Sequence, residues 1–467
     1  MSEPVAFLGR IDAAMATGGP TKVAANVRRV AGARDAVAAG HPDFDALRDR
    51  ARAIRLATLA DLAGHLERFA EAAEARGTVV HWASDAAEAN AIVTGVVRSV
   101  DGKRVVKGKS MVTEEIELNA ALEAAGVEVT ETDLGEFVVQ LSGDRPSHII
   151  APILHKTRED VARVFATELG EAYTDEPTAL NAIARRHLRQ RFLSADVGIT
   201  GANLAVAENG TIALVENEGN GRLTTTLPRV HVVLLGMERL VPTMEDLGVV
   251  LDVLARSATA QELTVYTNLV HGPRRPDDPD GAEELHVVVV DNGRSAMLGG
   301  DLAEILACIR CGACLNVCPV YQEIGGHAYG SVYPGPIGSV VSAGLWGVDP
   351  WSDLAHASTL CGACREVCPV RIDIPHLLAA VRAHGVEAGL APGWLSRGIG
   401  RFGRIADDER RWRRWEGLAR FGSAFLPTDD GWLTRLPGPG RGWTDHRDLP
   451  RPAKRPFRDR WEDRDGT

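Results

Sequence analysis

Seven cysteines, all between residues 308 and 368, constrain what this chain of 467 residues can fold into more than any other feature. Four of them, followed at once by a proline, form the run Cys308-x2-Cys311-x2-Cys314-x3-Cys318-Pro319. This is the spacing of bacterial ferredoxins, in which three thiolates hold one iron–sulfur cluster and the fourth reaches a second cluster. Soft sulfur ligands suit such clusters, and Gly312 lets the backbone approach one closely. The run therefore predicts two neighbouring iron–sulfur clusters in a protein that moves electrons.

A second, shorter run repeats the pattern as Cys361-x2-Cys364-x3-Cys368-Pro369. When the two Cys-Pro pairs are aligned, the position that Cys308 holds in the first run falls on Ser358 in the second. Crosswise ligation then supplies cluster 1 with four thiolates, those of Cys308, Cys311, Cys314 and Cys368. Cluster 2 receives only three, those of Cys318, Cys361 and Cys364.

The missing thiolate at cluster 2 leaves three interpretations open. Ser358 can ligate through its oxygen, a water or another group can complete a [4Fe–4S] cluster, or the site holds a [3Fe–4S] cluster. An open iron can also be the place where a partner or substrate binds. We favour two [4Fe–4S] clusters, the second with a non-cysteine fourth ligand.

Zinc and disulfides are the competing explanations for the cysteines. Paired CxxC units also form tetrahedral zinc sites, but such a site needs four ligands in two pairs, and here seven cysteines occur with two Cys-Pro endings. Disulfides are rare in the cytosol. We expect a cytoplasmic protein, because residues 1–10 lack the features of a secretory signal and the apolar runs are strand-sized, too short for a transmembrane segment.

Composition excludes one class of partner. The formal net charge is −11, which argues against a protein that binds nucleic acid by neutralising phosphates. Hydrophobic residues make up 45% and charged residues 25% of the chain, as in ordinary globular proteins. At this length, two or three domains are expected.

Composition also changes along the chain and predicts four segments. They are a helical N-terminal segment (1–75), an α/β domain (76–298), a ferredoxin-type iron–sulfur domain (299–385) and a C-terminal extension (386–467). The two cysteine runs are separated by a long spacer flanked by helical stretches, which looks like the α-helical ferredoxin module of electron-transfer subunits. The end of the extension, residues 449–461, is interpreted as an extended tail. His327, His356 and His376 are interpreted as surface or hydrogen-bonding residues, not cluster ligands.

Strands alternate with helices in the second segment, which predicts a largely parallel or mixed sheet. The expected strands are 78–82, 104–106, 127–130, 148–151, 210–215, 230–235 and 286–290. The expected helices are 85–99, 113–125, 158–169 and 178–192.

Several blocks taken together resemble the lactate utilization protein B family. The blocks are the two cysteine runs, Gly325–Gly330 and Gly335–Gly338 between them, Lys107–Met111 and Gly201–Thr211 in the α/β segment, and Gly442–Thr444 and Phe457–Trp461 near the end. The ferredoxin motif alone is common to many families, whereas the joint occurrence of these blocks is specific. The resemblance covers nearly the whole chain.

This resemblance implies a fold and a role. The α/β segment is expected to be a LUD domain, similar in fold to the ribose-5-phosphate isomerase and CoA-transferase superfamily. The chain is expected to be an electron-transfer subunit of a system that oxidises L-lactate to pyruvate. Its expected partners are a cysteine-rich subunit, a second LUD protein, and proteins that donate and accept electrons. No catalytic residue is assigned.

Two loops of the α/β segment have residues suited to an anionic ligand. In Glu208–Gly210 and Asn217–Arg222, Gly and Asn can surround a carboxylate and Arg222 can pair with it. We favour the alternative, a pair of turns between strands, because Asn-Gly is typical of such turns. Lys107 and Lys109 are interpreted as a solvated basic turn, with a ligand-facing position as the alternative. Neither a P-loop nor a GxGxxG after a strand is present, so nucleotide or flavin binding is unsupported.

Two functions compete with the electron-transfer subunit. One is a self-sufficient oxidoreductase that acts on a small organic acid at the LUD domain and uses the clusters as its electron outlet. The other is an iron–sulfur sensor or interaction protein.

Overall fold

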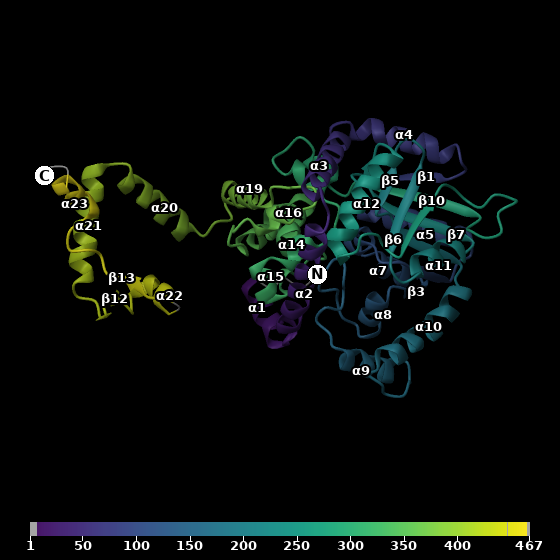
Figure 1. The fold of residues 1–467 in the computed structure, drawn as a ribbon, viewed down its shortest axis with the longest axis horizontal. Helices are drawn as coiled ribbons and strands as arrows, with labels where there is room; N and C mark the ends of the chain where they lie inside the picture. The colour runs from purple at the N-terminus through teal and green to yellow at the C-terminus, as the bar shows by residue number, and fades with distance from the viewer. Residues whose placement is uncertain (1–6, 446, 465–467) are drawn as a thin grey trace. The chain divides into compact units, whose positions relative to one another are not determined.

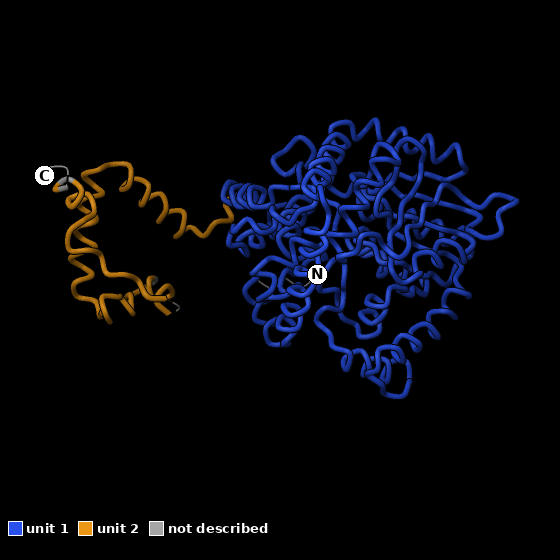
Figure 2. The backbone as a smooth tube through the Cα atoms, viewed as in Figure 1, with its two compact units in different colours: residues 1–388 blue, residues 389–467 orange. Residues whose placement is uncertain are grey.

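A computed structural model of the chain describes residues 7–445 and 447–464 (Figure 1). The chain forms two compact units, residues 1–388 and 389–467 (Figure 2). Of residues 1–10, considered above for targeting, the first six lie outside the described residues. All seven cysteines belong to the first unit.

Four helices begin the first unit, as the sequence predicts for this segment. They are α1 (Phe7–Ala16), α2 (Gly19–Ala39), α3 (Phe44–Ala60) and α4 (Leu62–Glu74). Pro20 in the first turn of α2 is well placed, because its missing N–H would have no helical partner there. Apolar residues of α2 and α3, such as Val27 and Ile54, lie in the same core as the cysteine region. The N-terminal helices are therefore part of the support for the cysteine loops.

A six-stranded, fully parallel sheet forms the centre of the α/β domain. In spatial order its strands are β1 (Val79–Ala83), β10 (Glu284–Val290), β7 (Val230–Gly236), β4 (Val197–Gly201), β2 (Arg104–Lys107) and β3 (Glu128–Glu131). Buried β-branched residues dominate β7 and β10, as expected of strands covered on both faces. β4 was not among the expected strands.

Alternate side chains of β7 enter two different cores. Val232 and Leu234 face the core shared with α5 (Ala86–Ser99) and α7 (Leu118–Ala124), whereas Val233 and Leu235 face the core shared with α4 and a second sheet. The second sheet contains β8 (Leu240–Val241), β5 (Leu204–Val206), β6 (Thr211–Glu216) and β9 (Tyr266–Val270). The domain thus has helices on one face of the parallel sheet and the small sheet with α4 on the other.

The helices of the α/β domain begin at recognisable caps. Asp85 caps α5 through the N–H of Glu88, and Thr157 with Asp160 forms a capping box at α9. These helices are α5 (Ala86–Ser99), α6 (Met111–Glu115), α7 (Leu118–Ala124), α8 (Leu134–Leu141), α9 (Arg158–Glu168), α10 (Pro177–Leu193), α11 (Asn220–Thr226), α12 (Met244–Thr259) and α13 (Arg294–Met297).

Two sequence predictions in this domain are wrong. The single helix expected at 113–125 is two helices, because Glu117 takes a left-handed φ of 53° and ends the first of them. The strand expected at 148–151 is a turn, in which His148 Nδ1 accepts the backbone N–H groups of Ile150 and Ala151. A side chain that satisfies these donors replaces the strand partner they would otherwise need.

The cysteine region contains helices and turns, and no strand occurs among residues 303–388. Its elements are η1 (Ala303–Ala307), α14 (Ala313–Asn316), α15 (Pro319–Ile324), η2 (His327–Tyr329), α16 (Gly335–Trp346), α17 (Val348–Trp351), η3 (Ser352–His356), α18 (Ala363–Glu366) and α19 (Ile374–Glu387). α16 is buried along most of its length and lies in the largest apolar core.

The second unit contains more structure than the extended tail predicted for residues 449–461. Its elements are α20 (Gly393–Ala406), α21 (Glu409–Ser423), β11 (Thr428–Asp429), β12 (Trp432–Leu433), η4 (Gly438–Gly440), α22 (Arg441–Thr444), β13 (Leu449–Pro450) and α23 (Phe457–Arg464). The tail prediction fails because Leu449 pairs with Leu433 across two short strands and Phe457 begins a helix. Among the described residues of the whole chain, no helix is both long and apolar enough to cross a membrane.

His231 gives the α/β domain a predictable sensitivity to acid. It is buried in β7, with Nε2 2.8 Å from Thr200 Oγ1, and burial lowers its pKa to about 3. Between this value and the ordinary pKa of about 6.5, the unfolded chain binds a proton that the folded chain does not, so stability falls as pH falls. At pH 5 this lowers the free energy of unfolding by about 2 kcal/mol relative to pH 7. Between pH 7 and pH 5, the free energy of unfolding of His231→Gln should fall by about 2 kcal/mol less than that of wild type. Urea unfolding at both pH values tests this, with the exposed His376→Gln as control.

Candidate metal centre

Four cysteines from both runs line a single pocket. Cys308 follows η1, Cys311 lies in the next turn, Cys314 is in α14, and Cys368 follows α18. The rest of the pocket wall is mainly aliphatic, formed by residues that include Ile149, Ile337, Val370, Ile372 and Ile374. These four cysteines are the set that crosswise ligation assigns to cluster 1.

The other three cysteines form a second group beside the first. Cys318 caps α15, and Cys361 and Cys364 lie in the turn and helix of the second run. Cys318 is close enough to Cys361 and Cys364 for their charges to interact, and α14 is in contact with α18. Cys361 is the exposed member of this group, whereas Cys318 and Cys364 are buried. The second group therefore reaches the protein surface.

Burial makes the thiolate form of most of these cysteines unfavourable on its own. It raises the pKa of Cys364 to about 12 and of Cys368 to about 11, and it also raises the pKa of Cys311, Cys314 and Cys318. A buried thiolate is stable only beside positive charge, which iron supplies when bound. At the exposed Cys361 the pKa is lowered, first by the N–H of Ala363 and then by the side chain of Thr359.

Backbone amides are already directed at sulfurs of both groups. The N–H of Arg310 donates to Cys308 Sγ at 3.3 Å, that of Tyr321 to Cys318 Sγ at 3.5 Å, and that of Ile372 to Cys368 Sγ at 3.4 Å. Such bonds stabilise thiolates and tune the reduction potential of iron–sulfur clusters. With four sulfurs around one pocket and a further three beside it, these residues fit two iron–sulfur clusters.

The turn at His148 belongs to the support of the first group. Gly312 has φ +75°, and a Cβ there would lie 2.9 Å from His148 Cε1, so the cysteine loop and this turn need the glycine. Because His148 Nδ1 accepts two N–H groups, its Nε2 carries the hydrogen and donates to Asn316 Oδ1 at 3.1 Å. Burial accordingly lowers the pKa of His148 to about 4.

Arginines of α2 and α3 bind the backbone of the second run. Arg34 donates to the carbonyl of Val367 at 3.1 Å, Arg48 to that of Cys368 at 2.8 Å, and Arg52 to that of Arg371 at 2.6 Å.

Arg55 of α3 binds the backbone just before the first run. It is fully buried and donates to the carbonyls of Leu306 at 3.0 Å and Ala307 at 3.3 Å. Sequence reasoning missed these residues. Their signal was the spacing 48, 52 and 55, which places three arginines on one face of a helix.

Comparisons with known proteins agree with this geometry. Residues 66–290 match the family model of the LUD domain, and residues 304–372 match that of the 4Fe-4S dicluster domain. A protein from Bacillus licheniformis named Lactate utilization protein B is 44% identical over 430 residues, which cover 90% of this chain and 89% of the relative. The chain belongs to the lactate utilization protein B family. Two further proteins with the same name are each 46% identical to this chain. The match to the protein from Shouchella clausii covers 89% of this chain and 88% of the relative. The match to the protein from Macrococcus caseolyticus covers 90% of this chain and 89% of the relative.

Membership of the lactate utilization protein B family confirms the family that the sequence blocks indicated. The LUD match coincides with the parallel-sheet domain, and the dicluster match with both cysteine runs. A crystal structure of a DUF162 family protein from Deinococcus radiodurans is also similar, at 16% identity over 49% of this chain and 98% of that one. The TM-score of this comparison is 0.28.

The LUD domain has a cavity of about 390 Å³ at the carboxyl ends of its parallel strands. Residues that follow β2, β4 and β7 line it, as is usual for ligand sites of open α/β sheets. Arg310, between two cysteines of the first run, lines it as well. Of the loop 217–222, for which an anion site was the alternative to a turn, Asn217, Glu218, Asn220 and Gly221 line this cavity, whereas Arg222 lines a separate groove.

The two predicted lysines lie in different surroundings. Lys107 is fully buried, with Nζ 2.8 Å from Glu131 and 3.0 Å from Thr113 Oγ1, so the interpretation as a solvated turn is wrong for this residue. An uncompensated ammonium would not be stable there, and Glu131 supplies the compensating charge. Lys109 lines the LUD cavity and pairs with Glu136. In the other loop, Gly210 takes φ +68° in the turn between β5 and β6.

The three histidines singled out by sequence differ in their surroundings. His356 and His376 are exposed, and His327 Nε2 is 2.8 Å from the carbonyl of Arg145. His327 also lies beside His155 and Asp144, close enough for the three to share a metal ion. Both ring nitrogens of His155 already have protein partners, in Ser147 and Asp144.

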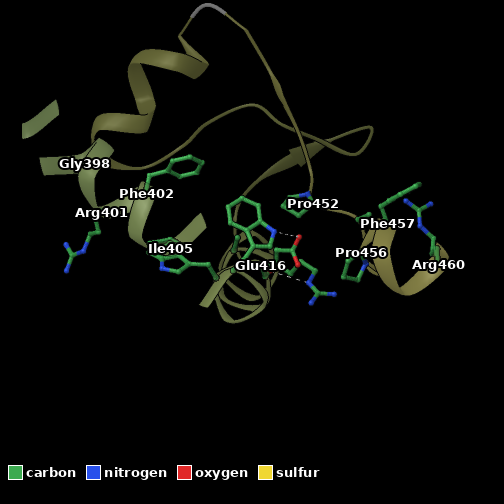
Figure 3. Close-up of a pocket in the computed structure, with 14 residues that line it drawn as sticks. Gly398, Arg401, Phe402, Ile405, Glu416, Pro452, Pro456, Phe457 and Arg460 are labelled. Atoms are coloured by element: carbon green, nitrogen blue, oxygen red, sulfur yellow. Dashed lines mark hydrogen bonds between the residues drawn. The ribbon is translucent and has the colours of Figure 1, made fainter. Parts of the chain in front are cut away.

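The second unit has an apolar pocket of its own, which no cysteine lines. Helices α20, α21 and α23 contribute to it, and Figure 3 shows Phe402, Glu416 and Phe457 around it. Trp412 and Glu416 both line this pocket, and Trp412 Nε1 donates to Glu416 Oε1 at 2.9 Å. It contains no cysteine or other iron ligand of the kind described above.

Proposed function

We propose that this chain is the iron–sulfur electron-transfer subunit of a system that oxidises L-lactate to pyruvate. Cys308, Cys311, Cys314 and Cys368 hold cluster 1, and Cys318, Cys361 and Cys364 hold three corners of cluster 2. The observation that carries the proposal is the presence of two adjacent cysteine groups, one enclosed and one reaching the surface. Such an arrangement suits a relay in which electrons enter and leave through partner proteins. The names of the relatives supply the connection to lactate.

Several finer features belong to the same proposal. The cysteine region has a helical ferredoxin-like fold, and the LUD domain is related to the ribose-5-phosphate isomerase and CoA-transferase superfamily. The protein works in the cytoplasm with a cysteine-rich subunit and a second LUD protein. The helices and turns of residues 303–388 and the parallel sheet support the two statements about fold.

A genetic experiment tests the role and a chemical one tests the clusters. Deleting the gene should abolish growth on L-lactate and leave growth on glucose intact, and the wild-type gene, but not Cys314→Ala, should restore it. Anaerobically purified protein should contain about eight irons and a similar amount of acid-labile sulfide. Normal growth of the deletion strain on lactate would contradict the role. Colourless protein with bound zinc would contradict the clusters.

The cavity of the LUD domain favours one alternative, an oxidoreductase that acts on a small organic acid without partners. Its volume of about 390 Å³ is enough for such an acid, and Arg310 joins its wall to the first cysteine run. Purified protein should then reduce an artificial electron acceptor with L-lactate. Absence of turnover with an intact cluster content would exclude this alternative.

A further inference from the structure

The two cysteine runs share a backbone conformation as well as a sequence pattern. The residue before the second cysteine position is left-handed in both, with φ 59° at Arg310 and 52° at Leu360. Non-glycine residues adopt such values rarely, so the coincidence is informative. The following glycines, Gly312 and Gly362, have φ 75° and 87°, and each precedes a helix of one turn, α14 or α18. The first run is therefore a guide to where side chains of the second run lie.

Ser358 holds the position that Cys308 has in the first run. In the first run Cys308 Sγ accepts the N–H of Arg310, two residues on, at 3.3 Å. In the second run Ser358 Oγ accepts the N–H of Leu360, also two residues on, at 3.1 Å. The side-chain heteroatom thus has the same relation to its loop in both runs.

The backbone around Ser358 is anchored from α19. Arg382 donates to the carbonyl of Ala355 at 2.9 Å and to that of Ser358 at 3.1 Å. Ser358 itself is half-buried, and the exposed Cys361 follows it three residues later. A ligand residue needs such support, because its donor atom must stay in place when the metal is absent.

We propose that the hydroxyl oxygen of Ser358 is the fourth protein ligand of cluster 2, in addition to the sulfurs of Cys318, Cys361 and Cys364. This inference rests on the proposed function, which supplies the cluster. One bond forms, between Oγ and iron, and the hydroxyl proton leaves to solvent, so the step changes no oxidation state. The N–H of Leu360 favours the deprotonated oxygen by donating to it. Oxygen is a harder donor than sulfur, so it favours ferric iron and lowers the reduction potential of this cluster relative to an all-cysteine one.

Three variants of the full chain, purified without oxygen, test the assignment. Ser358→Ala should lose one iron on mild oxidation, from about eight to about seven, and show the EPR signal of a three-iron cluster. Ser358→Cys should keep about eight irons and titrate at a higher potential than wild type. His356→Gln, at an exposed residue two positions before Ser358, is the control and should keep the iron content of wild type. Mössbauer spectra should show one distinct iron in wild type that Ser358→Cys lacks.

The possible outcomes separate this inference from the proposed function. If Ser358→Ala keeps the iron content, EPR spectrum and potential of wild type, a group other than Ser358 completes the cluster and the inference is wrong. If wild type itself has about seven irons and a three-iron signal before any oxidation, no fourth iron exists for Ser358 to bind, and the inference is again wrong. Both results leave the two-cluster relay intact. If the purified protein contains neither iron nor acid-labile sulfide, the proposed function itself is wrong.

Discussion

Replacing Cys368 with alanine should remove the same cluster as replacing Cys314, although Cys368 lies in the other run. Both sulfurs belong to the group that lines one pocket, whereas Cys318 and Cys364 belong to the neighbouring group. Each alanine variant removes a buried thiolate ligand, so we expect loss of about four of eight irons. Cys314→Ala and Cys368→Ala should leave one identical EPR spectrum, that of cluster 2. Cys318→Ala and Cys364→Ala should leave the other, that of cluster 1.

The decisive measurement is which variants share an EPR spectrum. Crosswise ligation and ligation of one cluster by each run predict different pairs of matching spectra. If each run held its own cluster, Cys318→Ala would resemble Cys314→Ala, and Cys368→Ala would resemble Cys364→Ala. That grouping would contradict crosswise ligation while leaving two clusters in place. Iron and sulfide are counted on the same anaerobic samples, and a variant of a surface residue, His376→Gln, serves as the control for handling losses.

Replacing Arg294 with methionine should strongly destabilise the fold. Arg294 is 1% exposed and donates to both oxygens of Glu115 at 2.8 Å and to Glu238 at 2.6 Å. Burial alone would raise the pKa of Glu238, yet Arg294 and Arg310 hold it at about 2. Without Arg294, two buried carboxylates lose their main counter-charge. Breaking a buried pair costs about 3–5 kcal/mol, a large fraction of the stability of a typical domain.

The effect should extend beyond the LUD domain. Glu115 also accepts the hydroxyl of Tyr333 at 2.6 Å, and the guanidinium of Arg310 lies 4.5 Å above the Tyr333 ring. Arg294→Met should therefore lower the melting temperature and also speed the loss of cluster 1. The matched control is Arg256→Met, which breaks an i,i+4 pair with Asp252 and should cost less than about 1 kcal/mol. Equal losses of stability in the two variants would show that the buried ion pairs of Arg294 contribute no more to stability than the pair of Arg256 with Asp252.

A second substitution that restores part of the lost stability would identify the cause of the destabilisation. In the double variant Arg294→Met, Glu115→Gln, one of the two stranded carboxylates is neutral, so the double variant should be more stable than Arg294→Met alone. Thermal unfolding and resistance to proteolysis compare the three proteins. If the second change adds a further loss, lost packing and not stranded charge causes the destabilisation.

The success and failure of sequence reasoning follow the range of the interactions involved. The spacing of the cysteines and the strong β-branched runs at 230–235 and 286–290 are local patterns, and the strands β7 and β10 occur there. The strand β4 was missed because Val197–Gly201 contains two glycines, and its strand character comes from its place between β2 and β7. Lys107 was taken for a solvated residue because its compensating carboxylate, Glu131, is on another strand.

By itself, the sequence determined the chemistry of this protein, because the ligand type and the number of residues between ligands are covalent properties of the chain. Cysteines spaced by two and three residues, each run ending in Cys-Pro, indicate iron–sulfur clusters whatever surrounds them. Only the tertiary structure decided which residues support the loops. Arg48, Arg52 and His148 meet the cysteine loops from elements far away in the chain, and nothing in their local sequence specifies those carbonyl and amide partners. Such contacts arise when helices and sheet pack into one core, so they can be read only from the folded chain.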